Sequence, residues 1–308
     1  MTDAPSIALA LAFALAGGWG ASHAGMRLLL PALRDSRMKA ENYRKTEVFV
    51  GLGVVWVFWA TALSLAVALQ RLSGIEIAIA PFGGQDAHPA MIAVAVVVGA
   101  FLFGLIDDVF GSSSAKGFKG HFRTLAKGRL TTGALKALGI GFVSLLAGFA
   151  IADLRGFAGI EYFGVALLST IVIALSANLL NLLDLRPGRA LKGYALMSCL
   201  GVLAIALPVF GGIAATLASA ASALLWLLGP AVAVARYDLA EEGMLGDAGA
   251  NAAGALVGLM LALGSSLPTL GVAAILLVAA NALSEKVSYT RLIEANTILS
   301  RVDSWGRK

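Results

Sequence analysis

The sequence predicts an all-α integral membrane protein, built as a polytopic bundle of transmembrane helices. Of its 308 residues, 59% are hydrophobic and only 13% are charged, and the mean hydropathy is +0.86. A soluble globular domain has about 45–50% apolar and about 25% charged residues, so this chain has too few polar side chains to cover a surface that faces water. The apolar runs are continuous, rich in Ala and Leu and without strict alternation, which favours helices over a β-barrel.

The apolar runs divide into about nine membrane spans, because each helical crossing uses ~20 apolar residues. The first run is Ile7–Trp19. The others are expected at residues 48–69, 90–110, 132–152, 162–182, 194–211, 213–235, 248–264 and 268–284. The loops between them are short, without low-complexity linkers or a clear internal repeat. We therefore expect one domain over residues 1–308, with a short tail from about residue 285.

The placement of the basic residues predicts the orientation of the bundle. Arg27, Arg34 and Arg37 follow the first apolar run, which is the opposite of a cleaved signal peptide and indicates a retained helix with its N-terminus outside. Nine spans then place the C-terminus inside and leave only Arg71 and Arg155, of 23 basic residues, on the outer side. This asymmetry accounts for the net charge of +5, so the basicity does not indicate nucleic-acid binding.

Four carboxylates occur at predicted cytoplasmic ends of spans. Asp107 and Asp108 end the third span, Asp184 ends the fifth and Asp247 opens the eighth. Ionisable groups at membrane depth commonly mark function, and Mg²⁺ takes one or two carboxylates together with water and substrate phosphates. Asp107 and Asp108 are ~100° apart on a helix, so one would be a ligand and the other a base. The alternative is that each is an ordinary solvated residue at the membrane interface.

A basic segment follows Asp184. Arg186, Arg189 and Lys192 are spaced by three residues, and if Pro187 begins a helix, Arg189 and Lys192 share a face near its positive N-terminus. Guanidinium groups suit phosphate oxygens. The segment therefore indicates phosphate binding, or alternatively a loop that sets topology and contacts anionic lipid headgroups.

Several asparagines complete the polar candidates. Asn178 and Asn181 lie on one helical face before Asp184, where hydrogen bonding between helices is the ordinary role. Asn42 and Asn251 are further candidates for substrate binding. The long loop at residues 111–136 either covers a phosphate-bearing substrate or lies along the membrane surface.

The order of these motifs resembles a known family, the polyprenyl-phosphate N-acetylhexosamine-1-phosphate transferases (glycosyltransferase family 4). The group includes phospho-MurNAc-pentapeptide transferase and the bacterial GlcNAc-1-phosphate transferases. The resemblance covers roughly residues 40–260 and lies in four blocks: Asn42-Tyr-Arg44, Gly104-x-x-Asp-Asp108, Asn178-x-x-Asn-x-x-Asp184, and Gly246-Asp-x-Gly249 followed by Gly254 and Gly258.

The resemblance implies a Mg²⁺-dependent enzyme in a bacterial-type plasma membrane. Such an enzyme moves a sugar-1-phosphate from a nucleotide sugar, here expected to be UDP-linked, to polyprenyl phosphate at the cytoplasmic face, in the synthesis of peptidoglycan precursors or envelope polysaccharides. By match of motif, Asp247 and Asp108 would bind the metal, and one of Asp107 and Asp108 would deprotonate or position the lipid phosphate. Asn181 and Asp184 would face the nucleotide.

The chain departs from the family pattern at three places. The region matching a histidine-rich cytoplasmic motif, Glu285–Glu294, contains no histidine, Pro187 replaces a second acid, and Met244 replaces an aromatic residue that stacks on the base. Arg186, Arg189 and Lys192 would then replace lost donor contacts by binding the diphosphate. The alternative function is a non-catalytic paralogue that binds polyprenyl phosphate or cell-envelope partners, and a transporter ranks last. The sugar and the oligomeric state stay open, with a homodimer as one option.

Overall fold

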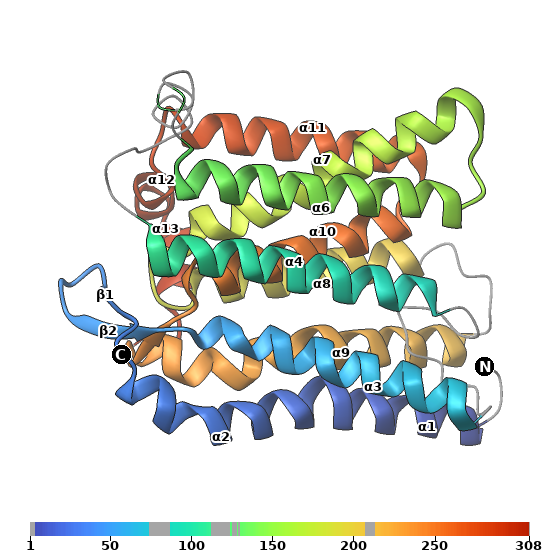
Figure 1. Ribbon diagram of the computed structural model, residues 1–308, viewed down its shortest axis with the longest axis horizontal. Helices are drawn as coiled ribbons and strands as arrows, with labels where there is room; N and C mark the ends of the chain where they lie inside the picture. The colour runs from blue at the N-terminus through green and yellow to red at the C-terminus, as the bar shows by residue number, and fades with distance from the viewer. Residues whose placement is uncertain are drawn as a thin grey trace.

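The protein is a bundle of long helices that lie side by side, seen here in a computed structural model that describes residues 4–73, 87–111, 124, 128, 130–206 and 213–307 (Figure 1). The helices are α1 (Ala4–Ala14), α2 (Ser22–Asp35), α3 (Val55–Ser73), α4 (His88–Phe110), α6 (Thr132–Leu154), α7 (Gly159–Leu183), α8 (Arg189–Ala206), α9 (Ile213–Leu239), α10 (Gly246–Gly264), α11 (Leu267–Ser284), α12 (Tyr289–Ala295) and α13 (Thr297–Ser304).

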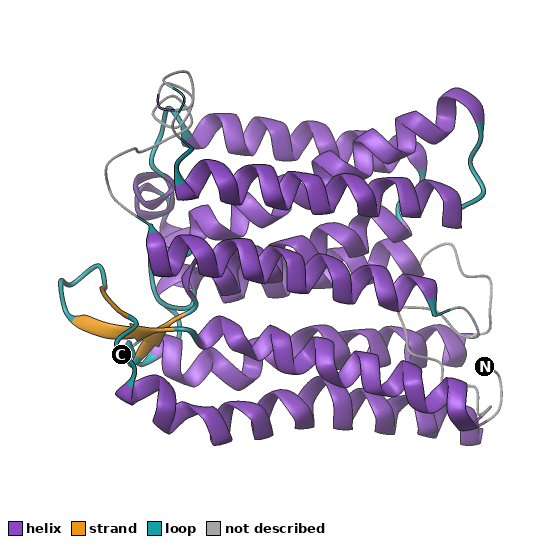
Figure 2. Cartoon of the chain, in the orientation of Figure 1, coloured by secondary structure: helices purple, strands orange, loops and turns teal. Residues whose placement is uncertain are grey.

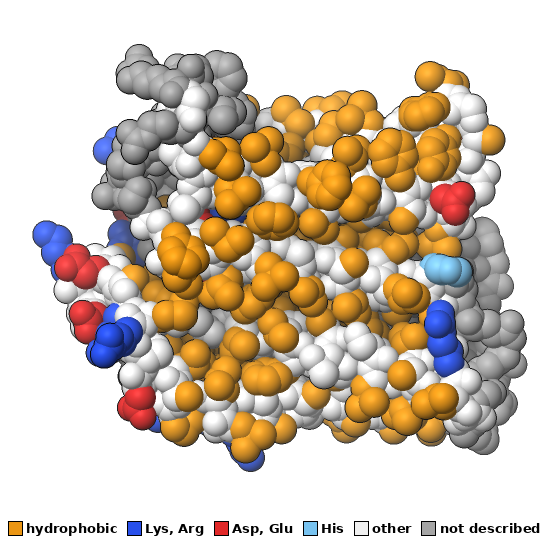
Figure 3. Space-filling view, in the orientation of Figure 1, with side chains coloured by type: hydrophobic (Ala, Val, Ile, Leu, Met, Phe, Trp, Pro, Cys, Tyr) orange, Lys and Arg blue, Asp and Glu red, His pale blue; other side chains and the backbone are white. Residues whose placement is uncertain are grey.

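Eight helices in the described part of the chain are long and apolar enough to cross a membrane, which confirms the predicted fold class. Charged side chains gather at the two ends of the bundle, and a broad band of hydrophobic side chains lies between them (Figure 3). The expected span at residues 194–211 is only partly described, because α8 ends at Ala206 and residues 207–212 lie outside the described ranges. The helix α1 begins at one end of the bundle, and α12 and α13 lie at the other (Figure 1).

The helix α10 lies at the centre of the bundle and packs against α4, α7 and α8. Its sequence is rich in Gly and Ala, and small residues allow helix backbones to approach closely in a membrane. A Cβ atom on Gly254 would lie 2.5 Å from the Cα of Ala177 in α7, and one on Gly104 in α4 would lie 2.6 Å from the Cα of Ala248. These contacts place the first turn of α10, with Asp247, directly against the end of α4.

A three-stranded sheet lies at one end of the bundle, where the sequence predicted only helix and loop (Figure 2). Its strands are β1 (Lys39–Glu41), β2 (Glu47–Val50) and β3 (Gly243–Met244), in the order β1-β2-β3, with β1 antiparallel and β3 parallel to β2. The second span was therefore predicted to begin too early, at residue 48 instead of Leu52, where a 3-10 turn (Leu52–Val54) leads into α3. The side chains of Val48, Phe49 and Val50 are buried, and Phe49 and Val50 pair with β3, a tertiary pairing that hydropathy does not reveal.

The first helical segment is also longer than the predicted run Ile7–Trp19. It continues from α1 through a π-helical turn (Leu15–Ala21) into α2, which ends at Asp35. The π-helical turn contains Gly18, whose Cβ would lie 2.6 Å from the Cα of Trp226 in α9. The close contact holds α2 and α9 side by side. Because the helix continues to Asp35, Arg27 lies within α2 and not in a loop after the span.

Candidate functional site

The predicted carboxylates converge at one end of the bundle, which we call the acidic end and define by Asp107, Asp108, Asp184 and Asp247. The contact between α4 and α10 is direct. The two carboxylate oxygens of Asp108 accept hydrogen bonds from the backbone amides of Asp247 (2.8 Å) and Ala248 (2.9 Å). Asp108 thus caps the N-terminus of α10 from a neighbouring helix, where the helix dipole favours a negative charge.

Lys136 joins two of the other acids. Its Nζ lies 2.7 Å from Asp107 Oδ2 and 2.6 Å from Asp247 Oδ2, and the lysine side chain is only 14% exposed. Lys136 lies near the N-terminus of α6, where the helix dipole disfavours a cation. The two carboxylates offset this unfavourable interaction. From the sequence, Lys136 is one of the basic residues expected on the inner side, without a further role. Its position as a lone cation inside the apolar run 132–152 indicates that it needs an acidic partner.

Asp184 lies at the end of α7, between these acids and a fifth one, Asp238. Burial raises the pKa of the Asp184 carboxyl well above its usual range, and the negative charges of Asp238, Asp247 and Asp108 raise it further. A hydrogen bond from the Gly246 backbone opposes this rise. Asp238 was not singled out from the sequence, and it accepts a hydrogen bond of 2.6 Å from the backbone amide of Gly188.

A small cleft opens beside Asp184. Its lining includes Asn42 and Tyr43 from the β1–β2 turn, Arg186 from the basic segment, and Asp238 at the end of α9. The guanidinium carbon of Arg186 lies 4.3 Å from the centroid of the Tyr43 ring. The cleft therefore has an aromatic and cationic wall facing an acidic one, which suits a ligand with a planar ring and phosphate groups.

Glu241 anchors the β1–β2 turn to the cleft. Its carboxylate accepts hydrogen bonds from Asn42 Nδ2 (3.1 Å) and the Tyr43 hydroxyl (3.0 Å), and it forms an ion pair with Arg44 (3.0 Å). Glu241 has a backbone φ of +58°, in the left-handed region that costs a non-glycine residue energy. The three donors stabilise Glu241 in this conformation. The side-chain amide of Asn42 is therefore already hydrogen-bonded to Glu241.

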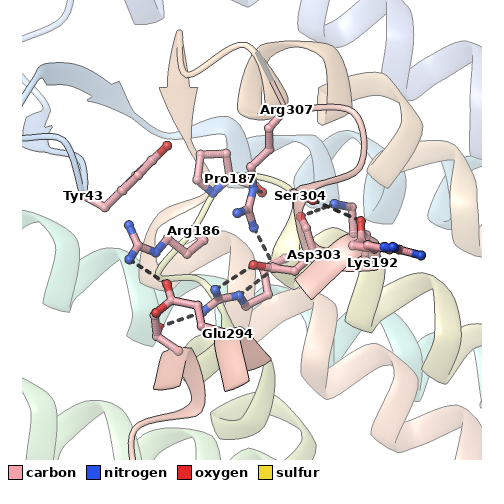
Figure 4. Close-up of polar contacts among 12 residues, drawn as sticks. Tyr43, Arg186, Pro187, Lys192, Glu294, Asp303, Ser304 and Arg307 are labelled. Carbon is pink, nitrogen blue, oxygen red and sulfur yellow. Dashed lines mark hydrogen bonds and ion pairs between the residues drawn. The ribbon is translucent and has the colours of Figure 1, made fainter. Parts of the chain in front are cut away.

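The basic segment is divided by the fold. Arg186 lines the cleft and forms an ion pair of 3.3 Å with Glu294 in α12. Arg189 is buried and donates two hydrogen bonds, of 2.8 and 2.9 Å, to the carboxylate of Asp303 in α13, and Lys192 Nζ donates to the Asp303 backbone oxygen at 2.6 Å (Figure 4). The structure thus brings one of the three predicted phosphate-binding cations to the cleft and uses the other two to hold the C-terminal helices.

We expect the Asp303 pairing to stabilise the fold. Burial alone would raise the pKa of the Asp303 carboxyl, but hydrogen bonds from Arg189 and Arg307 hold it below its usual value. Because the pKa is lower in the folded state, this stabilisation is present above the unfolded-state pKa of about 3.9 and is lost as pH falls through the folded-state value. Asp303→Asn should cost about 3–5 kcal/mol at pH 7, because it leaves Arg189 charged and buried without its partner.

Thermal unfolding in detergent at pH 7 and at pH 3 checks this expectation. The difference between wild type and Asp303→Asn should shrink at pH 3. The matched control is Glu294→Gln, which breaks the more exposed pair with Arg186 and should cost less than about 1 kcal/mol. Equal midpoints for the two variants at pH 7 would contradict the role of Asp303.

The remaining predicted residues have mainly structural surroundings. Asn178 Nδ2 donates to Asn281 Oδ1 in α11 at 2.7 Å, the interhelical role that the sequence favoured. Asn251 is buried and donates to the Asp247 backbone oxygen at 2.6 Å. Asn181 is half-buried, one turn before Asp184. Most of the loop at residues 111–136 that was considered as a substrate cover lies outside the described residues.

The Mg²⁺ site expected from the sequence stays a prediction. Within the described ranges, no group of three or more His, Cys, Asp or Glu side chains is arranged to hold a metal ion. Asp107 and Asp247 nevertheless flank a positive charge, the ammonium of Lys136, and all the acidic-end ligands are carboxylate oxygens. Mg²⁺ needs only one or two carboxylates, so Asp247 together with Asp108 satisfies its minimum requirement.

Comparison with known proteins adds no assignment. No protein-family model matches the chain, and no curated protein is significantly similar to it.

Proposed function

We propose that this protein transfers a sugar-1-phosphate from a nucleotide sugar to a membrane polyprenyl phosphate. The observation that carries the proposal is the joining of three distant segments at one end of a membrane bundle. Asp108 caps α10, and Lys136 bridges Asp107 and Asp247 beside a cleft with cationic and aromatic walls. Phosphoryl transfer depends mainly on positioning and charge neutralisation, which this set of groups can supply.

The proposed roles follow from the contacts of each side chain. Asp247 and Asp108 would hold Mg²⁺, which neutralises phosphate charge when bound. Asp107, whose carboxylate forms an ion pair with Lys136, would accept a proton from, or position, the lipid phosphate. Lys136 would hold the Asp107 carboxylate in place through their ion pair of 2.7 Å.

The donor would occupy the cleft beside Asp184. Arg186 is the cation available there for a diphosphate, and its stacking on Tyr43 orients its guanidinium plane. Met244 replaces the family's aromatic residue, but it lines the same cleft as Tyr43, which could stack on a nucleotide base. The acidic end would face the cytoplasm of a bacterial-type cell, where a water-soluble nucleotide sugar meets a lipid acceptor at the plasma membrane.

A turnover assay tests the proposal. Purified protein in detergent is incubated with polyprenyl phosphate and a panel of UDP- and CDP-linked sugars, with Mg²⁺ or with excess EDTA. We expect a lipid-linked sugar from at least one donor, with release of the nucleoside monophosphate, and no product with EDTA. Absence of product from the whole panel, by protein that is folded and monodisperse, would overturn the proposal.

A second candidate is a non-catalytic protein that binds polyprenyl phosphate or cell-envelope partners. It is favoured by the engagement of Asp107 and Asp247 with Lys136 and by the lack of a three-ligand metal arrangement among the described residues. The two candidates differ in a complementation test, in which the Asp247→Asn variant is expressed in cells that lack the gene. A non-catalytic protein predicts that the variant restores the wild-type phenotype, whereas a transferase predicts that it does not.

A further inference from the structure

A second basic cleft lies between α2 and α9, apart from the acidic cluster. Its lining includes the arginines Arg27 and Arg236 and the apolar side chains Met26 and Val232. The acidic-end carboxylates are not part of this lining. None of the functions proposed above uses it.

The two arginines in this cleft carry charges that no carboxylate balances among the described residues. Arg27 is exposed and forms no hydrogen bond or ion pair within those ranges. Arg236 donates to the hydroxyl of its neighbour Tyr237, and its guanidinium carbon lies 4.4 Å from the centroid of that ring. Arg34, farther along α2, instead forms an ion pair of 2.7 Å with Glu242. The cleft therefore presents two guanidinium groups to an anion from outside the chain.

The depth of Arg27 restricts the kind of anion. Arg27 lies seven residues before Arg34 in α2, about 10 Å along the helix axis at 1.5 Å per residue. Its neighbour Leu28 is 83% exposed, and Val232 beside the cleft is 43% exposed, as expected of side chains that contact lipid tails. A cation at this level is costly unless it reaches the interface or meets a counter-ion.

We propose that the cleft between α2 and α9 binds the headgroup phosphate of an anionic phospholipid. Arg27 and Arg236 donate to the phosphate oxygens, for which guanidinium groups have matching geometry. The acyl chains then lie along the exposed side chains of Val232 and Leu28, which a soluble phosphate could not use. The bound lipid belongs to the leaflet at the acidic end, because Arg236 is in the last turn of α9. This site does not depend on the proposed transferase activity.

Lipid retention measured by native mass spectrometry tests the site. Full-length protein in neutral detergent is titrated with phosphatidylglycerol or with phosphatidylcholine. We expect wild type to retain phosphatidylglycerol selectively, and Arg27→Gln combined with Arg236→Gln to lower its apparent affinity about tenfold or more, since hydrogen bonds to charged groups are being removed. The matched control is Arg37→Gln, an exposed arginine just beyond α2 that does not line the cleft, and it should retain the wild-type affinity.

The thermal midpoint of each variant without lipid verifies that it is folded, and the single variants replace the double variant if that one unfolds. Wild-type affinity in the arginine variants would overturn the site, and so would an equal loss in Arg37→Gln, which would indicate diffuse attraction to the surface. Displacement of phosphatidylglycerol by millimolar inorganic phosphate would assign the cleft to free phosphate. Displacement by an equimolar amount of polyprenyl phosphate would assign it to the proposed acceptor, and either result overturns the phospholipid assignment.

Discussion

Asp247→Asn is expected to lower the rate of sugar-1-phosphate transfer by about three orders of magnitude or more, a loss of about 4 kcal/mol of transition-state stabilisation. Asp247 contacts Lys136 at 2.6 Å and begins the helix that Asp108 caps. The substitution keeps the shape of the side chain but removes the charge that balances Lys136 and the ligand proposed for Mg²⁺. Initial rates at saturating Mg²⁺, with the donor identified in the panel assay, measure the effect.

The matched control is Asp153→Asn, the same chemical change near the opposite end of α6. Asp153 is exposed and lies in a different cleft from the acidic cluster, so its variant should retain the wild-type rate within about twofold. Thermal midpoints of both variants separate lost catalysis from lost folding. An Asp247→Asn rate within tenfold of wild type, in folded protein, would remove Asp247 from the reaction.

Gly254→Leu is expected to prevent the bundle from packing. A Cβ at this position would lie 2.5 Å from the Cα of Ala177, so backbone atoms of α7 would have to move. Overpacking in a close-packed core costs about 3 kcal/mol or more when the obstacle cannot move aside. The fraction of protein that elutes as a monodisperse peak in detergent, and its thermal midpoint, should both fall sharply.

Gly271→Leu is the control for this packing prediction. A Cβ on Gly271 in α11 meets nothing within 4 Å, so a side chain there should project outward, and the intrinsic helix preference of Leu over Gly should make the change neutral or slightly stabilising. If Gly254→Leu and Gly271→Leu behave alike, the contact between α7 and α10 does not determine the fold.

Much of the architecture could be predicted because hydropathy is a local property. Runs of apolar residues located the eight candidate spans, and the positions of Asp107, Asp108, Asp184 and Asp247 at span ends were enough to place them at one end of the bundle. The strand Glu47–Val50 was taken for helix because a short β-branched run is apolar in either structure, and its partner β3 is far away in the chain.

A membrane bundle with a cluster of acids at one end could be predicted from the residues alone. The partners of those acids and of the basic segment depend on how the helices pack. Lys136 meets Asp247 across 111 residues of chain, and Arg189 meets Asp303 across 114. No periodic sequence pattern predicts either pairing. The first depends on which helices the small residues of α10 allow to approach, and the second depends on where the C-terminal helices dock. The positions of charged residues within apolar runs indicate which groups need partners, and the packing of the helices determines which partner lies next to each one.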